Sequence, residues 1–170
     1  MHYVDEGPTH GTPPVIVCLH GNPTWSFYFR ELIRDLRRDF RVIAPDYIGC
    51  GLSDHPSNRH YRATERIDQV EDLLRQLGVN RYSLVMHDWG GPIGTGLAVR
   101  SIKSIERMVY FNTTLTEIES LPKIIRRAAR PIIGKFLTKT TMRFLKLTTD
   151  FGVVRSLPRA IKEGYYAPYQ

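Results

Sequence analysis

Short runs of apolar residues recur along the first two thirds of the chain. Each is four or five residues long and is bounded by Pro, Gly or charged positions, a pattern typical of strands buried on both faces of a parallel sheet. The predicted strands are Val15–Leu19, Arg41–Ala44, Ser83–Met86 and Arg107–Phe111.

Amphipathic segments separate these runs. Apolar residues at helical spacing predict helices over Ser26–Asp39, Thr64–Leu77 and Gly90–Arg100. Thr64 is expected to cap the second helix, because its hydroxyl can accept an otherwise unpaired backbone N–H. Gly78 stands where a left-handed residue ends such a helix. Alternating strands and helices predict an α/β fold with parallel strands and right-handed crossovers.

The alternation stops after Asn112. Residues 122–151 read as basic helices with an apolar side and a break at Pro131. We therefore expect two parts, a core over residues 1–120 and a smaller helical unit over residues 121–170. The apolar side consists of Ile124, Ile125, Ala128, Ile132 and Phe136.

The formal charge of +7 is unevenly distributed along the 170 residues. From Leu121 to Gln170 there are eleven Lys and Arg against two Asp and Glu, so this segment carries +9 and the first 120 residues carry −2. One interpretation is a helix that binds nucleic acid or a membrane surface. We favour a solvated outer helix face and expect no nucleic-acid partner, because Pro131 interrupts the stripe and no aromatic residue alternates with the charges before Phe136.

Composition limits the remaining classes. Two cysteines, Cys18 in an apolar run and Cys50 between glycines, are too few for a disulfide framework or a metal site, so both are expected to be inert. No stretch of 18 apolar residues suggests a membrane span, and the first seven residues are unlike a signal peptide. A cytoplasmic location without a metal or cofactor is the simplest expectation.

Chemistry is expected at two sharp turns, His20–Trp25 and His87–Gly91, because ligands of parallel sheets sit where strands end and helices begin. The second turn has the spacing of a nucleophile elbow, with Asp88 at the centre and the small residue Gly90 two positions later. A carboxylate is already nucleophilic at neutral pH and suits displacement at an sp³ carbon. The neighbouring helix dipole would favour its negative charge.

Attack by Asp88 would leave an alkyl ester, whose hydrolysis needs water, a general base and donors to an oxyanion. The backbone N–H groups of Asn22 and Trp89 are the candidate donors. Their side chains, an amide and an indole, are candidates to hold a departing halide. His20 and His87 are expected to order the loops rather than transfer protons.

Three segments carry a resemblance to a known family: HGNPTWS, APDYIGCGLSD (residues 44–54) and VMHDWGGPIG (residues 85–94). Together they resemble haloalkane dehalogenases of the α/β-hydrolase superfamily. The resemblance implies Asp88 as nucleophile and Asn22 with Trp89 as the halide clamp. It also implies that HYVDEG (residues 2–7) is the second strand of the family sheet and that residues 121–170 begin a helical cap.

Epoxide hydrolases share the HDWGG segment and are the alternative. They usually carry an aromatic residue where this chain has Asn22, which favours the dehalogenases. Under the epoxide alternative, Tyr165, Tyr166 and Tyr169 are candidate donors to an epoxide oxygen, and otherwise candidate cap residues at a substrate pocket.

The chain also departs from the family. The family's general base is a His near the C-terminus, whereas none of the six His residues here follows Asp88, and Asn112 stands where some relatives carry the supporting acid. The first hypothesis is a hydrolase that converts a small apolar haloalkane and water into an alcohol. The second is an incomplete chain limited to a single alkylation of Asp88, and the third is a binding protein that uses the basic segment.

Overall fold

The computed structural model describes residues 1–56, 62–114 and 141–169. The chain divides into two compact units, Met1–Leu115 and Thr116–Gln170, which are described separately below. The interpretation of the second unit as a cap remains a prediction.

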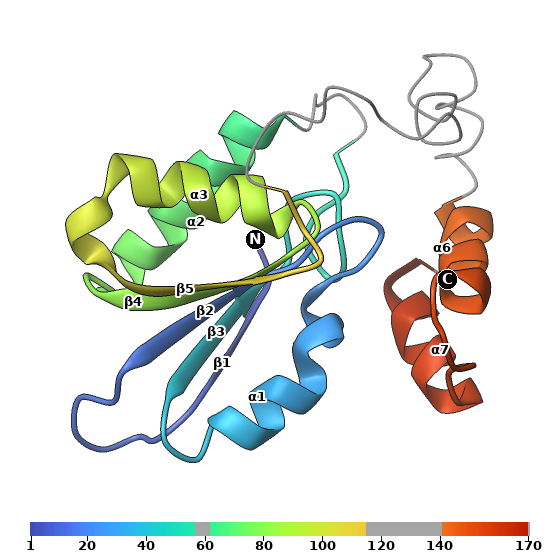
Figure 1. Ribbon diagram of the computed structural model, residues 1–170, viewed down its shortest axis with the longest axis horizontal. Helices are drawn as coiled ribbons and strands as arrows, with labels where there is room; N and C mark the ends of the chain where they lie inside the picture. Colours follow the sequence, from blue (N-terminus) through green and yellow to red (C-terminus); the bar gives the residue numbers. More distant parts are fainter. Residues whose placement is uncertain (57–61, 115–140, 170) are drawn as a thin grey trace. The chain divides into compact units, whose positions relative to one another are not determined.

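The first unit is built on a five-stranded sheet with the order β1-β3-β2-β4-β5 (Figure 1). β2, β3, β4 and β5 are mutually parallel, as the alternating sequence predicts, and β1 runs antiparallel to β3 at one edge. The strand bounds are β1 Tyr3–Glu6, β2 Val15–Leu19, β3 Arg41–Pro45, β4 Tyr82–His87 and β5 Ile105–Phe111.

Helices cover both faces of this sheet, with α2 and α3 on one side and α1 on the other (Figure 1). The helix bounds are η1 Ser26–Phe29, α1 Arg30–Leu36, α2 Ala63–Gln76, α3 Gly90–Arg100 and η2 Ile102–Ser104. The single helix predicted over residues 26–39 is a 3₁₀ turn followed by a shorter α-helix.

The prediction that Thr64 caps α2 is wrong. The helix begins at Ala63 after an extended Arg62, and no side chain caps it, because Ala63 is itself a strong helix former and extends the helix past Thr64. The prediction for Gly78 is confirmed: its φ of 67° is the left-handed conformation that ends the helix.

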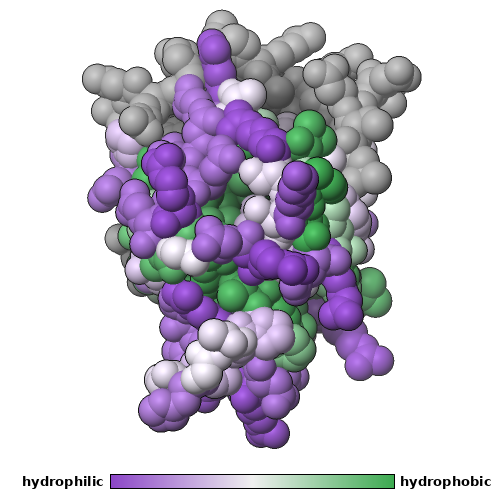
Figure 2. All heavy atoms as spheres, turned by 90° about the vertical axis from the view of Figure 1, so that its left-hand side faces the viewer, coloured by the Kyte–Doolittle hydropathy of each residue, from purple (hydrophilic) through white to green (hydrophobic). Residues whose placement is uncertain are grey.

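Side chains of the central strand alternate between two apolar clusters, one on each face of the sheet. Val17 and Leu19 of β2 pack with α2 and α3, and Ile16 and Cys18 pack on the α1 side. This two-sided burial is why the β2 sequence is continuously apolar. On the face shown in Figure 2, hydrophilic side chains predominate and hydrophobic groups show between them in patches.

The described part of the second unit contains α6 (Thr141–Phe151), α7 (Arg159–Tyr166) and η3 (Ala167–Tyr169). The hydroxyls of Thr149 and Tyr166 are hydrogen-bonded at 2.6 Å, and Lys162 forms an ion pair with Asp150. The sequence patterns had not predicted α7. The apolar stripe predicted over residues 124–136, with its break at Pro131, lies outside the described residues.

Among the helices that the structure describes, none combines the length and the apolar character needed to cross a membrane.

Candidate active site

Two turns lie side by side at the carboxyl ends of adjacent parallel strands. β2 and β4 pair in register, with Leu19 opposite Met86, so the residues after Leu19 and after His87 emerge at the same edge of the sheet. Ligands of open α/β sheets bind at this edge. The two turns that the sequence singled out are therefore neighbours in space.

Asp88 occupies a strained turn between β4 and α3. Its φ is 51°, a left-handed conformation that costs a non-glycine residue free energy and recurs at functional sites. The turn packs tightly: a Cβ on Gly90 would overlap the Leu19 carbonyl oxygen, and one on Gly91 would overlap the Thr113 side chain. Thr113 Oγ1 also donates to the Asp88 carbonyl oxygen at 2.5 Å, which ties the turn to the chain after β5.

The other turn supplies a donor to the Asp88 carboxylate. The backbone N–H of Asn22 donates to Asp88 Oδ1 at 2.9 Å. Gly21 leaves room for this contact, because a Cβ there would overlap the carboxylate. Within the described ranges, this is the one hydrogen bond to the carboxylate.

The two side chains predicted to hold a halide are both exposed on the first unit. Trp89 directly follows Asp88, occupies the position before the first residue of α3 without a capping side-chain hydrogen bond, and is 46% exposed. The Asn22 side chain accepts a weak hydrogen bond from Cys50 Sγ at 3.9 Å. The structure thus brings Asn22 and Asp88 into direct contact, and the halide role of Asn22 and Trp89 stays a prediction.

His20 is fully buried and both of its ring nitrogens have backbone partners. Nδ1 lies 3.0 Å from the Gly21 carbonyl oxygen, and Nε2 accepts the Tyr47 N–H at 3.2 Å. Burial lowers the pKa of this imidazole to about 4. His20 therefore stays neutral and joins the turn after β2 to the loop after β3, in agreement with the loop-ordering role expected from the sequence.

His87 is half-buried beside the nucleophile turn. Its ring stacks on Tyr28 with centroids 4.2 Å apart, and burial lowers its pKa. Nδ1 is buried without a hydrogen-bond partner among the described residues. The ring packs the turn against η1, and this contact fits the expected ordering role.

The sequence patterns missed Asp46, a fully buried carboxylate at the end of β3. Oδ1 accepts the backbone N–H of Ser26 at 2.7 Å, and Oδ2 accepts that of Leu52 at 3.0 Å and lies 2.7 Å from His2 Nδ1. This carboxylate fastens three segments, one of which continues from the Asn22 turn. The sequence shows Asp46 only as an acidic residue directly after a predicted strand, and this position is equally typical of an ordinary loop residue.

The described residues include no cluster of three or more His, Cys, Asp or Glu able to hold a metal ion. Both cysteines are buried, and burial raises the pKa of the Cys18 thiol to about 12 and that of Cys50 above its usual value. Protonated, buried thiols are poor nucleophiles, as expected for the two cysteines. In the second unit Tyr165 is buried, and its predicted role at a substrate pocket remains a prediction, as do those of Tyr166 and Tyr169.

Residues 14–155 match the alpha/beta hydrolase fold family. The chain belongs to this family. A mostly parallel sheet with helices on both faces and the Asp88 turn after β4 are features expected of an α/β-hydrolase. The resemblance to haloalkane dehalogenases is supported by solved structures: the haloalkane dehalogenase DatA from Agrobacterium tumefaciens C58 superimposes with a TM-score of 0.83 at 26% identity, over 99% of this chain and 62% of that one.

Two kinds of curated relatives are similar to this α/β-hydrolase chain. The cis-3-alkyl-4-alkyloxetan-2-one decarboxylase of Shewanella oneidensis is 40% identical over 99% of the chain and 54% of its own length. Haloalkane dehalogenase 2 of Mycobacterium tuberculosis is 36% identical over 93% of the chain and 51% of its own length. The chain therefore spans about half the length of these relatives.

Proposed function

We propose that Asp88 is the nucleophile of a haloalkane dehalogenase, in a protein of which these residues form the first part of the active site. The observation that carries the proposal is a carboxylate, rather than a hydroxyl or thiol, at the strained turn after β4. A carboxylate attacks an sp³ carbon without prior loss of a proton. The likeness to haloalkane dehalogenases in sequence and structure supports the same chemistry.

In the proposed reaction, an oxygen of Asp88 forms a bond to the carbon that carries the halogen. The carbon–halogen bond breaks and its electron pair leaves with the halide. The amide of Asn22 and the indole of Trp89 donate hydrogen bonds to the halide as its charge develops. The product at this stage is an alkyl ester of Asp88.

Hydrolysis of this ester requires a water molecule that attacks the ester carbonyl. The proposed oxyanion donors are the backbone N–H groups of Asn22 and Trp89, of which the Asn22 N–H already meets Asp88 Oδ1. A general base must accept the proton of the water. His20 is unsuited to this task, because its two nitrogens are engaged with backbone groups and its pKa is about 4.

A second candidate is supported by the 40% identity to an oxetan-2-one decarboxylase. Attack by Asp88 on the sp³ ring carbon bonded to the ring oxygen would break that C–O bond and leave a carboxylate on the neighbouring carbon. Cleavage of the C–C bond to this carboxylate then yields CO₂. Its electron pair forms an alkene as the ester C–O bond breaks and Asp88 is restored. This route consumes no water and needs no general base.

One experiment separates the two candidates. The full-length protein containing this chain is incubated separately with 1-bromobutane, with a carbonyl-labelled cis-3,4-dialkyloxetan-2-one and with styrene oxide. Bromide is measured by ion chromatography and labelled CO₂ by mass spectrometry. Bromide release supports the dehalogenase, CO₂ release supports the decarboxylase, and turnover of styrene oxide alone would favour the epoxide-hydrolase alternative.

The matched variants are Asp88→Asn and Asp72→Asn. The first removes the proposed nucleophile, and the second alters an exposed carboxylate on α2 that pairs with Arg75. Loss of whichever activity the unaltered protein shows in Asp88→Asn, with full activity in Asp72→Asn, is the expected result. Undiminished turnover by Asp88→Asn would contradict the proposal.

A further inference from the structure

Cys50 lies in the loop after β3, where hydrogen bonds hold its backbone. The Cys50 N–H donates to the Tyr47 carbonyl oxygen at 2.8 Å, and the Cys50 carbonyl oxygen accepts the Ser53 N–H at 3.2 Å. The N–H of Leu52, in the same loop, donates to the buried Asp46 carboxylate. These contacts fix the backbone from which the Cys50 thiol extends, and the residue itself is only 6% exposed.

The sulfur of Cys50 is in contact with two polar side chains. Nη1 of Arg66, on α2, donates to Sγ at 3.7 Å, and Sγ lies 3.9 Å from Oδ1 of Asn22. The Arg66 guanidinium also packs over the Tyr47 ring, 4.8 Å from its centroid, and this contact helps hold it beside the sulfur. Cys50 therefore connects α2 to the turn whose backbone contacts Asp88.

Donor and acceptor chemistry fixes the direction of the two contacts. A guanidinium has donors only, so the thiol proton of Cys50 cannot be given to Arg66. Burial raises the pKa of the Cys50 thiol above its usual value, so the sulfur keeps its proton near neutral pH. The S–H therefore donates to Oδ1 of Asn22 while the sulfur accepts from Arg66. The opposite orientation of the Asn22 amide would set two donors against one sulfur and take this acceptor from the thiol proton.

We propose that Cys50 is a positioning residue for the Asn22 amide. By binding Oδ1, the thiol leaves the amide NH₂ of Asn22, rather than its oxygen, for the departing halide. The backbone N–H of Asn22 is meanwhile held on the Asp88 carboxylate, so backbone and side chain are both oriented before a substrate enters. A donor oriented in advance need not reorganise as the halide charge develops. The inference rests on the proposed halide role of Asn22.

The contact itself is tested by infrared spectroscopy of the full-length protein containing this chain. The S–H stretching band lies where other protein groups absorb little, and it moves to lower frequency when the thiol donates a hydrogen bond. Subtracting the spectrum of Cys50→Ala isolates the Cys50 band. Asn22→Ala is expected to move this band to higher frequency, whereas Asn80→Ala, at an exposed position before β4, should leave it in place. A band that does not respond to Asn22→Ala would overturn the proposal.

The effect on the reaction is tested with 1-chlorobutane and 1-iodobutane. For each compound kcat/KM reports the steps up to cleavage of the carbon–halogen bond. Chloride is the smaller ion and accepts the stronger hydrogen bond, so a misplaced Asn22 amide penalises its departure more. Because a thiol is a weak donor, Cys50→Ala is expected to lower kcat/KM about two- to fivefold for 1-chlorobutane, and to change it less for 1-iodobutane.

Cys18→Ala is the matched control, because it removes the same atom from a fully buried cysteine of β2 on the α1 side of the sheet. It should leave the ratio of the two kcat/KM values unchanged, and circular dichroism confirms that each variant is folded. An equal loss for both compounds in Cys50→Ala would overturn the positioning role alone, since a purely structural change does not distinguish the halides. No halide release from either compound by the unaltered protein would instead overturn the proposed function, and the positioning role with it.

Discussion

The clearest stability prediction for the first unit concerns the Asp46 carboxylate. It is fully buried and accepts hydrogen bonds from the backbone N–H groups of Ser26 and Leu52, with His2 as a third partner. Asp46→Ala removes all three acceptor contacts. A buried donor left without a partner costs about 1–3 kcal/mol. The buried N–H of Ser26 should incur this penalty in full, whereas the part-buried contacts of Leu52 and His2 should each cost less. The expected decrease in the free energy of unfolding is therefore about 2–4 kcal/mol.

Urea unfolding followed by far-UV circular dichroism measures this loss as a lower midpoint at an unchanged slope. Asp46→Asn keeps one acceptor oxygen and should lose less than Asp46→Ala. Asp72→Asn, an exposed carboxylate paired with Arg75, is expected to change the free energy of unfolding by about 0.5 kcal/mol or less. A loss below about 1 kcal/mol in Asp46→Ala would refute the view that this carboxylate fastens the three segments.

Three further predictions follow from the site. Gly21→Ala is expected to abolish alkylation of Asp88 by 1-bromobutane, because the added Cβ would displace the carboxylate. Gly11 lies in open space at a positive φ, so Gly11→Ala should alter stability alone. Equal reactivity of the two variants would contradict this prediction. Thr113→Val removes the donor to the Asp88 carbonyl oxygen and should lower stability by about 1 kcal/mol in urea unfolding, while an unchanged midpoint would exclude a role for this contact. Burial lowers the pKa of His20 to about 4, so the unfolded chain binds a proton at this residue first as the pH falls. The free energy of unfolding should therefore decrease by about 3 kcal/mol between pH 6.5 and pH 4. His20→Gln should flatten this pH dependence in urea unfolding measured across that range.

The architecture of the first unit follows closely from the apolar pattern. Continuous apolar runs are strands, as β2 illustrates: both of its faces pack on a cluster, so no polar residue fits between Val15 and Leu19. Parallel pairing then follows from the helices between strands. Helix ends were less predictable, because Thr64 and Ala63 are both compatible with the first turn of α2 and the choice between them is a small difference in free energy.

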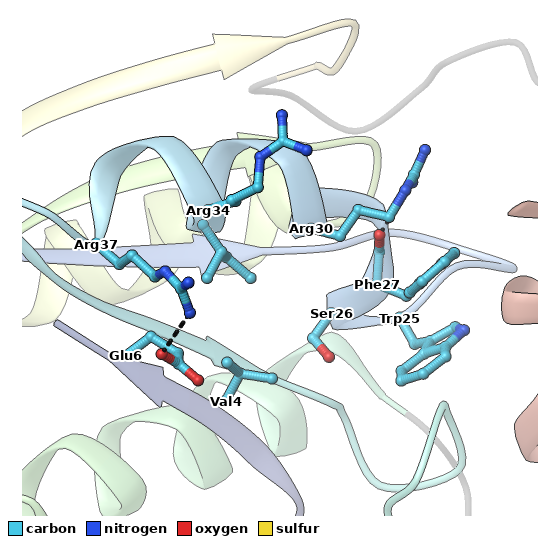
Figure 3. A pocket seen from close by; sticks show the side chains of 9 residues that line it. Val4, Glu6, Trp25, Ser26, Phe27, Arg30, Arg34 and Arg37 are labelled. Atoms are coloured by element: carbon cyan, nitrogen blue, oxygen red, sulfur yellow. Dashed lines mark hydrogen bonds and ion pairs between the residues drawn. The ribbon is translucent and has the colours of Figure 1, made fainter.

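Part of the candidate site could be predicted from the sequence. A tight turn leaves a signature of glycines, and the structure gives Gly21, Gly90 and Gly91 the close contacts that exclude a side chain. Long-range contacts leave no such signature. The partners of Asp46 are up to 44 positions away in the sequence, so its role as a fastener depends on the folded arrangement of segments. A pocket between β1, η1 and α1 (Figure 3) was missed for the same reason, because Val4 and Glu6 of β1 line it together with distant residues of α1.

The most direct test of the central claim is the site of covalent attachment. The chain is incubated with 1-bromobutane, digested with a protease and mapped by tandem mass spectrometry. The account predicts one butyl group on Asp88, with an equal amount of bromide released, and no adduct at this position in Asp88→Asn. Bromide release with the butyl group on another residue, or an undiminished adduct in Asp88→Asn, would contradict the assignment of Asp88 as the nucleophile.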